Sequence, residues 1–290
     1  MQINRYVSDY NLDVTKISFS YLLELAAALR EYYDSLVLIG GWVPFFILEH
    51  FKKPTVDFRH IGSIDIDLAV DPKVFDEGID KYRTIIEHIE KLGYAQKKDR
   101  LNNVVPSSFV KLTKEGMDIQ VDFLTSFIKE YPKSKRHLKV QPDLMARRTK
   151  GCETAFTHNW ECPLVGNLPG NGEIKLKIKV ANVVSGIAMK SQALAERLDG
   201  KDPYDIYTMV AYYKDGPSSA AEGFKPYTKI PIIADSLRIL DENFQKQNSN
   251  GPVRVGYFLY PNDTVMREKA STDAYMTVRE FLNLLGKSSG

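Results

Sequence analysis

The stretch that decides the fold runs from residue 36 to residue 70 and reads LVLIGGWVPFFILEHFKKPTVDFRHIGSIDIDLAV. A short apolar run ends in two glycines, an amphipathic segment follows, and a second apolar run carries Asp65 and Asp67. Because successive side chains of a strand point to opposite faces, side chains at i and i+2 share a face and lie roughly 7 Å apart. The two carboxylates are therefore expected on one side of a strand.

The neighbours of these aspartates, among them Ile64, Ile66 and Leu68, are typical of a buried central strand. Carboxylates in such a place are normally paired or bound to a metal, because desolvating them alone is costly. A pair of hard oxygen ligands suits Mg²⁺ (or Mn²⁺), since the phosphates of a substrate can supply the other ligands. The alternative interpretation is that the aspartates stand at a strand end, where they are solvated or cap the next turn.

The composition is that of a globular protein with a substantial core. The chain has 290 residues, 43% of them hydrophobic, and a net charge of +2. This length allows one large or two ordinary domains, and the charge is too small to favour any class of partner. No apolar run approaches the ~20 residues of a membrane span, and the N-terminus has no basic-then-apolar signal pattern. We therefore expect a cytoplasmic protein.

Cys152 and Cys162 are the only cysteines, which is too few for a disulfide framework. His158 lies between them, so a metal site is an alternative. A structural zinc site has four ligands and a tighter cysteine pair, however, and we expect free thiols.

Gly40 and Gly41 directly follow the predicted strand 36–39 and precede a helical pattern over residues 42–51. Glycine at such a place lets the backbone approach a ligand closely or adopt a positive φ. A strand, a glycine turn and a helix N-terminus together present N–H groups to an anion such as a triphosphate. Taken alone, the glycine pair also fits an ordinary turn.

A third strand carboxylate comes from a predicted hairpin of residues 109–113 and 117–124, turned at Lys114-Glu115-Gly116. Its second strand contains IQVDFL, in which Asp122 lies in an apolar run like the one around Asp67. Three carboxylates from neighbouring strands would form a one-metal or two-metal site for phosphoryl transfer.

Residues 129–150 are strongly basic. Against Glu130 and Asp143 stand Lys129, Lys133, Lys135, Arg136, Lys139, Arg147, Arg148 and Lys150. Such a run is consistent with binding to the phosphate backbone of nucleic acid, and equally with a solvated loop.

From about residue 181 the pattern becomes helical, which indicates a second domain. Lys190 and Arg197 are seven residues apart, so on one helix they lie within ~20° of each other around the axis. With Lys201 they could grip a nucleoside triphosphate, or form an ordinary charged face. We expect helices over residues 232–244 and 263–285 and a short strand-like piece over residues 253–259.

Asp202 and Asp205 lie at the start of the next predicted helix, DPYDIYTMVAYY. Asp202 can be its N-cap and Asp205 lies in its first turn, so capping accounts for both aspartates without any function.

Together these residues resemble the nucleotidyltransferase superfamily that includes DNA polymerase β, and within it the branch of AbiEii-like nucleotidyltransferase toxins, which also contains the MenT toxins. The matching elements are Gly40-Gly41, His60-x-Gly62-Ser63-x-Asp65-x-Asp67-Leu68, Val121-Asp122-Phe123, and the helical motif M-K-x-x-A-L-x-x-R-x-x-x-K-D-x-Y-D-I from Met189 to Ile206. The resemblance covers roughly residues 18–210, and the last motif points to the toxin branch.

The resemblance implies an α+β fold. Residues 1–180 would form a catalytic domain with a mixed sheet flanked by helices, and residues 181–290 a mainly helical domain. Asp65 and Asp67 would hold the metal, and Asp122 would be the third carboxylate.

The resemblance also implies a nucleotide site. Gly40 and Gly41 would cradle the phosphates, and Ser63 would belong to the same site. Lys190, counted among the catalytic residues, would neutralise charge there together with Arg197. Asp202 and Asp205 match acidic positions of the branch motif, so capping need not be their only role.

The implied activity is Mg²⁺-dependent transfer of a nucleoside monophosphate from an NTP to a hydroxyl acceptor. The acceptor would be RNA, in particular a tRNA end, and the protein a toxin of a toxin-antitoxin or phage-defence system with a cognate antitoxin. Two alternatives stay open: transfer to a small antibiotic-type molecule, and a non-catalytic NTP-binding protein of the same fold.

One residue departs from the superfamily pattern. Trp42 follows the second glycine, where many members have Gly-Ser. The loss of that hydroxyl near the phosphates could weaken NTP binding or alter the choice of nucleotide. The sequence does not identify the acceptor, the nucleotide or the oligomeric state.

Overall fold

The computed structural model describes residues 6–72, 84–127, 136–170 and 172–286, which form two compact units. The sheet unit consists of Leu12–Trp42 and Ser63–Ala181. The helical unit consists of Met1–Asn11, Val43–Gly62 and Asn182–Gly290. The predicted division was into residues 1–180 and 181–290. In the structure, two segments from the first part, residues 1–11 and 43–62, belong to the helical unit.

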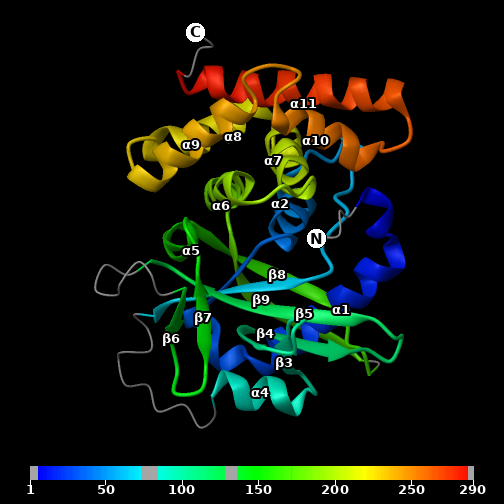
Figure 1. Cartoon of the computed structure of the whole chain (residues 1–290), viewed down its shortest axis with the longest axis vertical. Coiled ribbons are helices and arrows are strands. Elements are labelled where there is room, and N and C mark those ends of the chain that lie inside the picture. Colours follow the sequence, from blue (N-terminus) through cyan, green and yellow to red (C-terminus); the bar gives the residue numbers. More distant parts are fainter. Residues whose placement is uncertain (1–5, 73–83, 128–135, 171, 287–290) are drawn as a thin grey trace. The chain divides into compact units, whose positions relative to one another are not determined.

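The sheet unit is built around one mixed sheet, with the order β3-β4-β5-β2-β1-β9-β8 and with β7 paired to β5 and β6 (Figure 1). Its strands are β1 (Leu36–Ile39), β2 (Ile66–Val70), β3 (Ala95–Lys98), β4 (Val104–Leu112), β5 (Asp118–Thr125), β6 (His137–Lys139), β7 (Met145–Arg148), β8 (Asn159–Asn167) and β9 (Glu173–Ala181). Its helices are α1 (Leu12–Ala28), the 3₁₀ helix η2 (Arg30–Ser35), α4 (Ile85–Lys91) and α5 (Cys152–Thr157).

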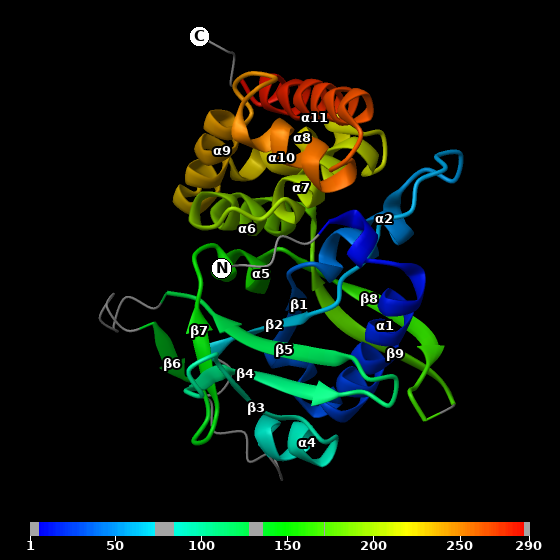
Figure 2. The ribbon, with the colours of Figure 1, turned by 45° about the vertical axis from the view of Figure 1, so that its right-hand side comes forward.

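Helices cover both sides of this sheet. Helix α5 packs on β1, β2, β5 and β9, whereas α1 packs on β8 and β9 and also contacts α4. Figures 1 and 2 show α5 on one side of the sheet and α4 on the other. The buried strands β1, β2 and β5 therefore form the centre of the unit.

Local signals explain several element boundaries in this unit. The Thr84 side chain accepts a hydrogen bond from the N–H of Glu87, and the Glu87 side chain accepts one from the N–H of Thr84, which is a capping box at the start of α4. Gly93 follows this helix with a φ of +88°. The predicted hairpin around Gly116 is confirmed, because β4 and β5 pair antiparallel with Leu112 opposite Asp118.

The helical unit contains most of the longer helices. Its elements are η1 (Val7–Asp9), α2 (Trp42–Phe51), α6 (Val183–Glu196), α7 (Lys201–Tyr212), α8 (Pro217–Phe224), η3 (Lys225–Tyr227), α9 (Pro231–Asn243), α10 (Asn250–Leu259) and α11 (Thr264–Leu284). The first residue of α2, Trp42, is counted with the sheet unit. The Asn182 side chain caps α6 by accepting hydrogen bonds from the N–H groups of Val184 and Ser185.

Helix α2 has the predicted bounds, but it packs within the helical unit. A Cβ added to Gly186 of α6 would lie 3.0 Å from a side-chain atom of Val43 and 3.0 Å from the sulfur of Met209. The glycine thus allows α2 and α7 to approach α6 closely.

The strand-like prediction for residues 253–259 is wrong, because this segment belongs to helix α10. The apolar run is short, and such runs do not distinguish a strand from a buried helix. Packing against α11 decides the outcome: a Cβ at Gly256 would lie 2.6 Å from the carbonyl oxygen of Arg267. Glycine at this point therefore lets α10 approach α11 closely.

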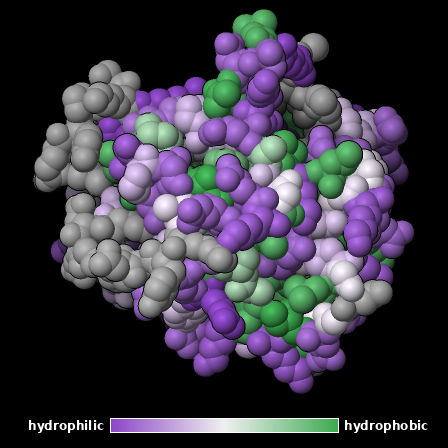
Figure 3. All heavy atoms as spheres, turned by 90° about the horizontal axis from the view of Figure 1, so that it is seen from below, coloured by the Kyte–Doolittle hydropathy of each residue, from purple (hydrophilic) through white to green (hydrophobic). Residues whose placement is uncertain are grey.

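The prediction of an α+β fold is confirmed at this level: a mixed open sheet is flanked by helices, and several helices follow it. Among the described residues, no helix combines the length and the apolar composition that crossing a membrane requires. Hydrophilic residues cover most of the face drawn in Figure 3, and the hydrophobic ones form separate groups.

Candidate functional site

Asp67 and Asp122 lie side by side on the sheet. Strands β2 and β5 pair in parallel, with Asp67 opposite Asp122 and Leu68 opposite Phe123. Residues opposite each other on neighbouring strands share a face, so both carboxylates project from the same side. Leu68 lines a cavity with Leu25 of α1, so the aspartates occupy the face turned away from α1. Both aspartates are half-buried.

Gly40 lies directly against Asp67. Ile39 is opposite Asp67 in the β1–β2 pair, and Gly40 follows with a φ of +73°. A Cβ added to Gly40 would lie 1.9 Å from Oδ2 of Asp67 and 2.7 Å from its Cγ. Glycine is therefore required at position 40 for two reasons: the backbone has a positive φ, and the Asp67 carboxylate fills the space that a Cβ would occupy.

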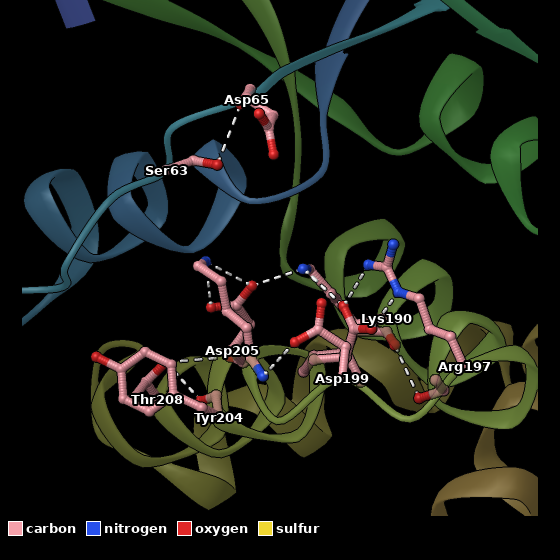
Figure 4. A network of polar contacts seen from close by, with 12 residues as sticks. Ser63, Asp65, Lys190, Arg197, Asp199, Tyr204, Asp205 and Thr208 are labelled. Atoms are coloured by element: carbon pink, nitrogen blue, oxygen red, sulfur yellow. Dashed lines mark hydrogen bonds and ion pairs between the residues drawn. The ribbon is translucent and has the colours of Figure 1, made fainter. Parts of the chain in front are cut away.

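Asp65 lies one residue before β2, whereas the sequence pattern placed it within the strand. The difference arises because sheet pairing starts at Ile66, opposite Val121. The Ser63 hydroxyl donates a hydrogen bond to the backbone oxygen of Asp65 over 3.1 Å (Figure 4). Ser63 thus holds the turn that leads to the acidic strand.

The two oxygens of Asp122 have different surroundings. Gln120, on the same face of β5, donates from Nε2 to Oδ2 over 2.8 Å. Oδ1 is buried and has no hydrogen-bond partner among the described residues. A buried carboxylate oxygen without a donor is unusual and is suited to a cation.

Asp67 and Asp122 are therefore the residues that could hold a divalent cation of the Mg²⁺ type, which needs only one or two protein carboxylates. In the described part of the chain, no three His, Cys, Asp or Glu side chains form a group that could hold a metal ion. The participation of Asp65 as a further ligand stays a prediction.

A second polar cluster lies in the helical unit, between α6 and α7 (Figure 4). Lys190 Nζ lies 3.0 Å from Oδ1 of Asp202 and 2.6 Å from Oδ2 of Asp205. Both aspartate side chains are fully buried, and that of Lys190 is 9% exposed. Burial disfavours the charge on Lys190, but the attraction of Asp205 and Asp202 outweighs it and raises the pKa of Lys190.

Two further cations complete this cluster. Arg197 donates from Nε to Oδ2 and from Nη2 to Oδ1 of Asp202, over 2.7 and 2.9 Å. Lys201 donates to both oxygens of Asp205, over 2.9 and 3.0 Å. Burial opposes the charge on Asp205, but Lys190 and Lys201 hold the pKa of this carboxyl well below its usual range. Lys190 and Arg197 thus have carboxylate partners inside the protein.

The prediction that Asp202 is the N-cap is wrong, because Asp202 lies in the first turn of α7, and Asp205 follows three residues later. Helix α7 begins at Lys201 after Gly200, and no side chain caps it in the way predicted. The carboxylate of Asp199 accepts from the N–H of Lys201 instead. Inside the protein the charges of both aspartates are compensated by Lys190, Arg197 and Lys201, which helix-start patterns do not reveal.

His60 is a member of this cluster to which the sequence assigned no role. The N–H of Gly62 donates to its Nδ1 over 3.1 Å, so the ring proton is on Nε2, which donates to Oδ1 of Asp205 over 3.1 Å. Burial lowers the pKa of His60 to about 4, because Asp205 offsets only part of the desolvation. The only sequence signal was its place just before Gly62 and Ser63.

The other predicted residues are distributed as follows. Trp42 is buried and its ring packs on Phe19 at a centroid distance of 5.8 Å, so it serves the core. Gly41 is buried next to it in the turn before α2. Cys152 and Cys162 are free buried thiols, as expected, and burial raises the pKa of Cys162 to about 12.

Part of the basic stretch, Lys129, Lys133 and Lys135, lies outside the described residues. Arg148 is buried, with its guanidinium 4.5 Å from the ring centroid of Phe127. Arg136, Lys139 and Lys150 are exposed and Arg147 is half-buried. Arg148 therefore belongs to the core. Of the described cations of this stretch, Arg136, Lys139, Arg147 and Lys150 are the ones that solvent or a phosphate can reach.

No protein-family model matches the chain, and neither a curated protein nor a solved structure matches it.

Proposed function

We propose that the chain is a nucleotidyltransferase, which transfers a nucleoside monophosphate from an NTP to a hydroxyl acceptor. The observation that carries the proposal is the pairing of Asp67 with Asp122 on neighbouring parallel strands, with Gly40 directly against Asp67. Phosphoryl-type transfer needs positioning and charge neutralisation and no covalent protein group. Two half-buried carboxylates beside a glycine turn are suited to that task.

In this proposal Asp67 and Asp122 hold Mg²⁺, with Asp65 as a further candidate ligand. The bound ion would neutralise the charge of the triphosphate and of the departing pyrophosphate. In this proposal the turn at Gly40 and Gly41 would present backbone N–H groups to phosphate oxygens, and the hydrogen bond from Ser63 would keep the approach to β2 in place. Within the helical unit, Asp202 and Asp205 pair with Lys190 and Arg197, so the proposal does not rest on these two cations.

We propose RNA as the acceptor and a toxin role for the activity. The exposed cations Arg136, Lys139 and Lys150 support a polyanionic acceptor. A cognate antitoxin is part of the same proposal.

The test is a transfer assay with Mg²⁺, each labelled NTP in turn, and either total RNA or antibiotic-type hydroxyl compounds. We expect label in RNA, and we expect Asp67→Asn to reduce transfer at least about 100-fold because it removes charge at the reacting phosphates. Asp118→Asn is the matched control, since Asp118 is an exposed residue of β5. Label found only in small molecules would contradict the RNA acceptor, and no transfer to either acceptor would contradict the proposed function.

A further inference from the structure

A cavity of about 40 Å³ lies in the sheet unit, on the side of the sheet that α1 covers. Its floor is apolar and includes Leu25 of α1, Leu38 of β1 and Leu68 of β2. These side chains are nearly fully buried, so the floor is a rigid part of the core.

Cationic side chains line the same cavity: Arg30, Lys177 and Lys179. Lys179 is bound to Asp34 over 2.9 Å, and Lys177 lies 3.5 Å from Glu161 in a pair whose side chains are 66% and 58% exposed. Within the described ranges, Arg30 has no carboxylate partner, and it is exposed. An exposed guanidinium beside an apolar floor is a docking point for a carboxylate.

We propose that this cavity binds a small aliphatic carboxylate, with its chain on the leucine floor and its carboxylate on Arg30. Convergent polar groups around an apolar pocket are the usual features of a small-molecule site. The volume exceeds the ~10–15 Å³ that one water needs and is well below the ~150 Å³ of a cavity that holds benzene, which favours a chain of a few carbons. The site does not depend on the proposed transferase activity.

Such a ligand would contact the strands that carry the acidic site. Leu68 of β2 lies on the α1 side, and its neighbour Asp67 lies on the opposite face. Leu38 of β1 also lines the cavity. The next residue, Ile39, points to the opposite face and precedes Gly40.

The test is a calorimetric titration of the whole protein with butanoate, pentanoate and hexanoate, with hexanol and hexylamine as uncharged and cationic controls. We expect one saturable site, with affinity rising about fourfold per methylene until the floor is covered. Hexanol should bind about tenfold more weakly than hexanoate, because it lacks the charge-assisted contact. No saturable binding, or equal binding of hexanol and hexanoate, would overturn the proposal.

Two variants locate the site. Arg30→Gln should remove the preference for hexanoate over hexanol, whereas Lys114→Gln, at an exposed turn of the same unit, should leave it unchanged. Ala26→Phe should abolish binding, because residue 26 lines the cavity and the larger side chain fills it. A phenylalanine at position 26 also changes the packing around it, so the Arg30→Gln result decides: an unchanged hexanoate preference in that variant would overturn the assignment.

Discussion

His60 donates a hydrogen bond from Nε2 to Oδ1 of Asp205 over 3.1 Å, although 145 residues separate them in the sequence. Both side chains are fully buried, and the His60 ring also stacks on Tyr204 at a centroid distance of 5.3 Å. The bond ties segment 43–62 to helix α7 within the helical unit. It also connects the histidine to a carboxylate that two lysines already compensate.

This environment predicts a specific dependence of stability on pH. The folded-state pKa of His60 is about 4, below its ordinary value of 6.5, so between these values the unfolded chain binds a proton that the folded chain does not. The free energy of unfolding should therefore fall by up to about 3 kcal/mol as the pH decreases from 6.5 to 4. His60→Gln should flatten the slope in urea titrations followed by the helical circular dichroism signal. An equally steep slope in the variant would show that other groups cause it.

Gly40 should tolerate alanine less well than another glycine of the same backbone conformation. Gly116 also has a positive φ, +80°, but an added Cβ would meet no atom within 4 Å. Gly116→Ala should cost only the left-handed strain of about 1–2 kcal/mol. Gly40→Ala should cost roughly 1–3 kcal/mol more, because the methyl group displaces the Asp67 carboxylate. Equal losses in urea unfolding would contradict the close approach of Asp67.

The buried cluster should respond to charge removal far more strongly than a surface ion pair. Asp205→Asn removes the negative charge that Lys190 and Lys201 share. Because this leaves buried positive charge uncompensated, we expect the free energy of unfolding to fall by about 3–5 kcal/mol. Glu242→Gln is the control, because its pair with Arg238 is more than half exposed on both sides, and it should cost less than about 1 kcal/mol. A similar small effect for both variants would indicate that the cluster is solvated.

Local patterns predicted much of the fold. The strand at residues 36–39, the helix at residues 42–51 and the hairpin around Gly116 follow from apolar periodicity and turn residues, and the structure has all three. A place for Asp122 on a strand next to that of Asp65 and Asp67 was expected, because Asp122 and Asp67 lie in similar apolar runs, and β5 does adjoin β2. The parallel register of these two strands could be established only from the structure.

Long-range contacts account for what the sequence did not reveal. Residues 253–259 are helical, with Gly256 close to α11, and helix α8 was not anticipated despite Pro217 at its start. The ion pairs of Lys190 with Asp202 and Asp205 join different helices, so spacing within one helix suggested a free cationic face instead. For the same reason His60 could be noticed in the sequence but not assigned a partner.

The most direct test of the central claim is Mn²⁺ binding, measured by electron paramagnetic resonance in the presence of a non-hydrolysable NTP analogue. We predict that Asp122→Asn weakens Mn²⁺ binding at least about tenfold, because Asp122 would be a direct ligand. Asp118→Asn, on the same face of β5, should bind as the unmodified protein does. If Asp122→Asn binds Mn²⁺ as tightly as the unmodified protein, Asp67 and Asp122 do not form the metal site, and the account is contradicted.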